Sequence, residues 1–105
     1  MKLKDKKIAQ DLKKRLSQEV DLIDLKIYGS RVPETNDEYS DLDVYVRVNT
    51  INKNIKQKIF DIAWELGFNN NIFISTLIFS DDEIKNTPLR SSPILKNIYK
   101  YGITI

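Results

Sequence analysis

The chain has no cysteine and no histidine among its 105 residues, and it has only three glycines and three prolines. The absence of cysteine excludes disulfide bonds and thiolate metal sites. The absence of histidine excludes a Ser-His-Asp triad, a histidine general base and a zinc ion held by histidine. Any chemistry must therefore use carboxylates, hydroxyl groups, lysine, arginine or a bound ion.

Long apolar runs are also missing, and none approaches the length of about 20 residues that crosses a membrane. No signal peptide precedes the basic N-terminal stretch, so we expect a cytoplasmic protein without a membrane partner. The net charge of +2 is too small to indicate direct binding of nucleic acid. A chain of this length predicts a single domain that spans residues 1–105.

Apolar spacing predicts secondary structure in the order helix, strand, strand, helix, strand, helix, helix. The first two strands alternate between apolar and polar residues, and Ile23, Leu25 and Ile27 of the first are expected to point inward. Helices should therefore pack on one face of a small mixed sheet and leave the other face open, which is an α+β fold. The expected helices cover residues 4–17, 51–66, a short stretch after Ser80, and 93–101, and the expected strands cover 22–28, 41–48, 72–79 and 103–105.

The most informative stretch combines a Gly-Ser turn with a pair of aspartates. Gly29 and Ser30 end the first strand, and Asp41 and Asp43 begin the second strand ten residues later. The two aspartates share the polar face, with Cα atoms about 6–7 Å apart from the strand rise. Like charges this close raise the pKa of one carboxyl group unless a cation lies between them, and Mg²⁺ prefers such oxygen ligands. The stretch therefore predicts a site for Mg²⁺ and a nucleoside triphosphate.

This arrangement resembles the signature of the nucleotidyltransferase superfamily related to DNA polymerase β. Its specific part runs from Gly29-Ser30, over ten residues, to Asp41-x-Asp43. The length and the helix-first order look like the minimal nucleotidyltransferases, which are small stand-alone domains. The run from Ser92 to Ile98 also resembles the way these domains end, so the resemblance covers nearly the whole chain.

The resemblance implies a role for each motif residue. Asp41 and Asp43 would be the catalytic residues and would hold the Mg²⁺ ion that bridges the triphosphate. Gly29 and Ser30 would contact the β- and γ-phosphates. Arg31 either adds a charge-assisted contact to a phosphate or is a solvated loop arginine. The implied activity is Mg²⁺-dependent transfer of a nucleoside monophosphate, AMP from ATP, to a hydroxyl group, with pyrophosphate as the leaving group.

The resemblance also implies a protein partner. Many minimal nucleotidyltransferases are the antitoxin of a toxin–antitoxin pair, in which the toxin is a small helical HEPN ribonuclease. Some of them transfer AMP to a tyrosine of that toxin. Because the chain shows no second domain that would bind an acceptor, we expect the acceptor to lie on a partner protein such as a HEPN toxin. Oligomerisation is also compatible with the sequence.

One feature departs from the family pattern. The family normally supplies a third carboxylate from the next strand, where the aligned position here is Phe73, and residues 72–79 contain no carboxylate. The acidic residues 81–83 are instead typical of a helix N-terminus. Two alternatives therefore stay open. One is a degenerate nucleotidyltransferase that neutralises its partner by binding alone, and the other is a subunit that modifies a small molecule such as an aminoglycoside.

Overall fold

The elements follow the order that the sequence predicts, with small differences at their ends. A computed structural model describes residues 1–37 and 39–105. The predicted strand at 72–79 starts two residues later than expected, and a 3₁₀ turn separates the last two helices. The elements are α1 (Leu3–Glu19), β1 (Leu22–Tyr28), β2 (Leu42–Val48), α2 (Lys53–Asn69), β3 (Ile74–Ser80), α3 (Asp81–Asn86), the turn η1 (Pro88–Ser91), α4 (Pro93–Tyr101) and β4 (Ile103–Thr104).

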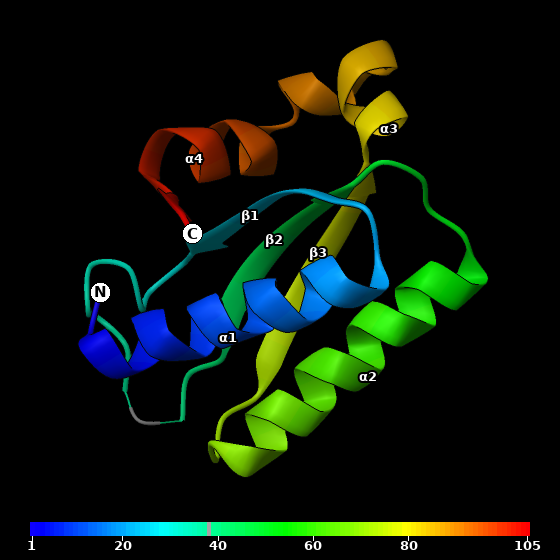
Figure 1. Cartoon of the computed structure of the whole chain (residues 1–105). Coiled ribbons are helices and arrows are strands. Elements are labelled where there is room, and N and C mark those ends of the chain that lie inside the picture. Colours follow the sequence, from blue (N-terminus) through cyan, green and yellow to red (C-terminus); the bar gives the residue numbers. More distant parts are fainter. Residues whose placement is uncertain (38) are drawn as a thin grey trace.

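The four strands form one mixed sheet in the order β3-β2-β1-β4 (Figure 1). β1 pairs antiparallel with both β2 and β4, whereas β2 and β3 run parallel, with α2 connecting them. The predicted α+β class with a small mixed sheet is therefore confirmed. Because β1 and β2 pair antiparallel, the end of β1 lies beside the start of β2, and the Gly-Ser turn and the aspartates meet at one end of the sheet.

The two long helices, α1 and α2, cover one face of the sheet (Figure 1). Each contributes an apolar stripe with helical spacing, as predicted, and the stripes pack on the inward residues of β1 and β2. This burial, at roughly 25 cal/mol per Å² of apolar surface, is the main source of stability in a domain of this size. The fully buried members are Ala9, Leu12, Leu16, Ile27, Leu42, Val44, Val46 and Ile59.

The sequence suggested that the opposite face of the sheet is open. In the structure α4 and α3 lie against part of this face (Figure 1). Tyr45 of β2 points to this face and is fully buried in a second cluster with Leu95 and Ile98 of α4. Its hydroxyl group is 2.6 Å from that of Tyr99, so the polar tip is satisfied. A tyrosine in an alternating strand is compatible with either a solvated or a covered face, and the apolar side of α4 decides between them.

The expected inward position of Ile23 is wrong. The register between β1 and β2 shifts between Leu22 and Asp24, which is a bulge that turns Leu22 toward the core in place of Ile23. Ile23 is consequently 47% exposed. Strict alternation fails here because a bulge inserts one residue and exchanges the two faces of the strand.

Within the part of the chain that the structure describes, no helix combines the length and apolar character that a membrane span requires.

Candidate nucleotide and metal site

Asp43 lies inside β2, between one residue on each neighbouring strand. Its register partners are Tyr28 at the end of β1 and Ser75 on β3. Asp41 precedes the strand and is exposed, while Leu42 between them is fully buried. The backbone there is fixed by a hydrogen bond from Leu42 N to the carbonyl oxygen of Phe73, 2.9 Å long. The start of β2 therefore presents one partly buried and one exposed carboxylate to the face that carries α4.

Gly29 is the residue that allows the Asp43 carboxylate to lie against the loop after β1. Its φ angle of +81° is in the left-handed region, which side chains disfavour. A Cβ atom added at this position would collide with Oδ2 of Asp43. The positive φ angle therefore favours glycine, and the lack of a side chain lets the Asp43 carboxylate lie directly against the Gly-Ser turn, as the motif predicts.

The charges in this site repel one another. Burial raises the pKa of the Asp43 carboxyl group, and the negative charge of Asp41 raises it further. Burial also raises the pKa of the Tyr28 hydroxyl group, and the neighbouring charge of Asp43 adds to this effect. Each shift disfavours a further negative charge beside Asp43.

A cavity of about 350 Å³ lies between the Gly-Ser loop and α4. Two predicted phosphate-contacting residues, Gly29 and Ser30, line it, and α4 contributes Asn97 and Tyr101. The sequence predicted α4 as a helix but gave no indication that it would face this loop, since nothing local relates residues about 70 positions apart. The lining residues are Tyr28, Gly29, Ser30, Val32, Pro33, Asn97 and Tyr101.

Arg31 occupies a different place from its neighbours in the motif. Its side chain is buried and pairs with Asp5 of α1, 3.2 Å away. The same guanidinium group donates hydrogen bonds of 3.0 and 2.7 Å from Nε and Nη2 to the carbonyl oxygen of Ser40, the residue before Asp41. Arg31 therefore fixes the end of the loop that leads into the aspartates, and a contact with phosphate stays a prediction.

Ser75 is the direct register neighbour of Asp43 on β3, and β3 carries no carboxylate. Phe73, the position aligned from the sequence, precedes the strand by one residue and is half-exposed. Among the residues that the structure describes, no cluster of three or more acidic side chains could hold a metal ion. The later acidic residues cap α3 as predicted, since Ser80 and Glu83 form a capping box and Asp81 pairs with Arg47.

Comparison with known proteins gives a match at the level of the fold. No protein-family model and no curated protein matches the sequence. A chain in a solved structure, described as the crystal structure of a toxin-antitoxin with AMP-PNP, superposes with a TM-score of 0.62 and 18% sequence identity. The match covers 97% of this chain and 72% of the other. At this identity the two chains share a fold.

Asp43→Asn is expected to stabilise the metal-free protein at neutral pH. Because folding raises the pKa of Asp43, the unfolded state loses its proton first as the pH rises above 3.8, and wild-type stability falls until the pH passes the folded pKa. The variant avoids this loss. The gain should not exceed about 1 kcal/mol, because the group is partly solvated, and it should vanish at acidic pH.

The measurement is the free energy of unfolding by urea in a chelator, for both proteins, at neutral pH and below the ordinary aspartate pKa. Asp11→Asn, on the exposed side of α1, is the control substitution. If the difference in unfolding free energy between the variant and wild type is the same at both pH values, the electrostatic explanation is contradicted.

Arg31→Met should destabilise the fold by about 3–5 kcal/mol, because it leaves the Asp5 carboxylate buried without a partner. The double variant Asp5→Leu with Arg31→Met removes both charges and should regain most of this loss. Urea unfolding followed by circular dichroism measures both. The expected alternative of a solvated loop arginine is wrong, because Arg31 is buried. If the single variant lies within about 1 kcal/mol of wild type, then the ion pair with Asp5 does not hold the loop, and a phosphate-binding role for Arg31 is favoured.

Proposed function

We propose that this protein is a Mg²⁺-dependent nucleotidyltransferase that transfers AMP from ATP to a hydroxyl group of a partner protein, as the antitoxin component of a toxin–antitoxin system. The observation that carries the proposal is the packing of Asp43 against Gly29, which joins the two halves of the motif in one site. The structural neighbour supports the toxin–antitoxin part of this proposal, because it is described as a toxin-antitoxin with AMP-PNP.

The residues at this site suit a magnesium ion. Mg²⁺ is commonly held by one or two carboxylates, with phosphate oxygens and water completing an octahedron. Asp43 lies against Gly29 and Asp41 is exposed just before the strand, so the two residues could supply two carboxylates, and a neighbouring cation would offset the repulsion that raises the pKa of Asp43. A bound Mg²⁺ would neutralise charge on the triphosphate.

The protein itself would contribute positioning. Gly29 and Ser30 line a cavity of about 350 Å³ in which the nucleotide would be held. The attacking hydroxyl oxygen forms a bond to the α-phosphorus, and the bond between this phosphorus and the bridging oxygen of the β-phosphate breaks. Pyrophosphate then leaves with the electron pair of that bond, and the proton of the hydroxyl group passes to water. Holding the reactants in line accounts for much of the rate in such transfers.

The acceptor would come from the partner. The resemblance to minimal nucleotidyltransferases points to a tyrosine hydroxyl group on a helical HEPN-type toxin, and a covalent product persists even when transfer is slow. The site is open to such a partner at Asp41, which is exposed at the beginning of β2.

A second function is favoured by one observation, the serine beside Asp43 in place of a carboxylate. A missing general base typically lowers a rate by 10²–10⁴-fold. If the remaining rate is too low, the protein would act as a binding-only antitoxin that covers its partner without modifying it. The two functions differ in whether a covalent product forms.

Incubation with the protein encoded by the neighbouring gene, Mg²⁺ and ATP should increase the mass of that protein by whole AMP units. Intact mass spectrometry measures the product. Asp41→Asn and Asp43→Asn should each abolish it, and calorimetry should show that the double variant binds Mg²⁺·ATP much more weakly than wild type. A neighbour that is bound and inhibited but never modified would favour the binding-only function.

Ser75→Asp should raise the rate of transfer by about tenfold or more, because it returns a carboxylate at the strand spacing of about 4.8 Å from Asp43. Ser75→Asn is the control, since it has nearly the same shape without the charge. Phe73→Asp, the substitution that the sequence alone suggested, should have a smaller effect. Equal rates for the Asp and Asn variants at position 75 would mean that the third carboxylate does not limit this enzyme.

A further inference from the structure

The outer flank of α2 carries a row of exposed aromatic side chains. Phe60, Trp64 and Phe68 follow one another at intervals of four residues and are 51%, 56% and 74% exposed. The other flank of α2 faces α1, where Arg15 and Glu65 form an ion pair of 2.9 Å. The aromatic row, defined as Phe60, Trp64 and Phe68, therefore lies on the side of α2 that has no neighbouring helix.

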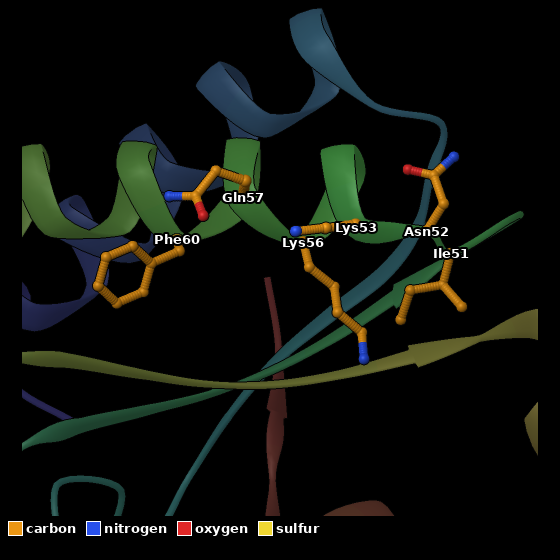
Figure 2. Close-up of a pocket in the computed structure, with 6 residues that line it drawn as sticks. All are labelled: Ile51, Asn52, Lys53, Lys56, Gln57 and Phe60. Atoms are coloured by element: carbon orange, nitrogen blue, oxygen red, sulfur yellow. The ribbon is translucent and has the colours of Figure 1, made fainter.

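The aromatic row runs beside the edge of the sheet at β3. One hollow of about 370 Å³ is lined by Trp64 and Phe68 together with Phe73 and Ile74 at the start of β3. A second hollow of about 510 Å³ lies at the other end of the row, around Phe60 (Figure 2). Residues just before α2 and in its first turns complete it: Ile51, Asn52, Lys53, Lys56 and Gln57. The row and the strand edge thus form one elongated surface.

The edge strand on this surface lacks the usual protection. β3 pairs with β2 on one side and is the last strand of the sheet on the other. Its seven residues, ISTLIFS, include no charge, no proline and no glycine. Exposed edges of stable monomers are normally protected by such residues, by bulges or by a covering segment. An unprotected edge next to three exposed aromatic side chains is typical of a surface that another chain covers.

The charges on α2 indicate which chain covers it. Lys53 and Lys56 lie at the N-terminal end of the helix, where the helix dipole is positive, and the first turn has no acidic residue. The last turn, where the dipole is negative, has no basic residue. Among the ion pairs between described residues, neither lysine takes part. The helix is thus unfavourably charged on its own, and an antiparallel copy of the same helix would correct this at both ends.

We propose that the outer flank of α2 and the edge of β3 form the interface of a two-fold symmetric dimer. With the axis near Trp64, Phe60 of each copy packs against Phe68 of the other, because both lie four residues from Trp64. Lys56 then lies beside the C-terminal turn of α2 in the other copy. A two-fold arrangement also separates the lysines of the two copies by most of the length of the helix, so they do not repel.

The size of the surface is compatible with a dimer if both parts take part. An aromatic side chain buries about 150–250 Å², so three that are half-exposed or more offer roughly 300 Å² per copy. A typical stable interface needs about 800 Å² per partner. The aromatic row alone is too small, and the seven-residue edge and the adjoining hollows must supply the remainder.

This interface is independent of the proposed activity. α2 covers the face of the sheet opposite to α4, whereas the Gly-Ser loop, Asp43 and α4 form the nucleotide site (Figure 1). Dimerisation would leave the nucleotide site of each copy open, with both sites on the same side of the dimer.

Size-exclusion chromatography with light scattering, over the micromolar range, tests the proposal on the full chain. Wild type is expected to have twice the monomer mass, and Trp64→Lys is expected to be monomeric at the same concentrations while keeping its circular dichroism spectrum. Ile94→Lys, an equally exposed apolar position on α4, should stay dimeric. A wild type that is monomeric throughout overturns the proposal, whether or not it associates with another protein.

Reversing the charge of Lys53 and Lys56 distinguishes a role of these residues in the dimer from a role within the monomer. Lys53→Glu with Lys56→Glu places acidic residues at the positive end of the helix, which should stabilise the folded monomer. In the proposed dimer the same change places four carboxylates beside the two negative helix ends. The dissociation constant of the dimer should therefore rise tenfold or more. A double variant that dimerises as tightly as wild type would refute the antiparallel arrangement.

Discussion

The structure depends on burial of β2 on both faces of the sheet. Its alternate apolar residues, such as Val44 and Val46, meet the helices α1 and α2, while Tyr45 meets α4 on the opposite side. A strand that is paired on both edges and covered on both faces is the most constrained segment of a sheet. Both clusters therefore fix the position of the same backbone, and Asp43 lies on that backbone, where the cover from α4 ends.

Charged residues occur on β2 only where a partner or an opening exists for them. Arg47, near the C-terminal end of the strand, donates to Asp81 of α3 from both Nε and Nη2. Asp43, near the N-terminal end, lies next to the Gly-Ser loop and its cavity, where burial and a neighbouring charge both raise its pKa. Arg47 thus has an oppositely charged partner, whereas the charge nearest to Asp43 is the like charge of Asp41. A carboxyl group whose pKa is raised by burial and by a like charge is a candidate functional group.

The loop between β1 and β2 is fixed by a pair of opposite charges. Asp5 and Arg31 form a buried ion pair whose guanidinium group also binds the carbonyl oxygen of Ser40. Removing two charges from water is costly, so such a pair contributes more to a defined geometry than to overall stability. In this protein the defined geometry is the entry of the chain into Asp41 and Asp43, and the proposed transfer reaction would require it because small displacements of reactive groups lower the rate strongly.

The sequence by itself determined the features that depend on residues close together in the chain. Helical and strand periods located nearly every element, and the Gly-Ser turn and the paired aspartates located one end of the site. Gly29 was identifiable because a positive φ angle at the end of a strand calls for glycine. These signals are local, so one segment carries the whole of each.

Only the tertiary structure decided what depends on segments that meet across the fold. It placed α4 against Tyr45 and the Gly-Ser loop, made Ser75 the neighbour of Asp43, and gave Arg31 a partner in α1. It also exposed the aromatic row on α2, which the sequence pattern alone does not distinguish from a flank covered by another helix. The physical reason is that packing and strand register are set by the summed contacts of distant segments, whereas periodicity reports only which side of an element is apolar.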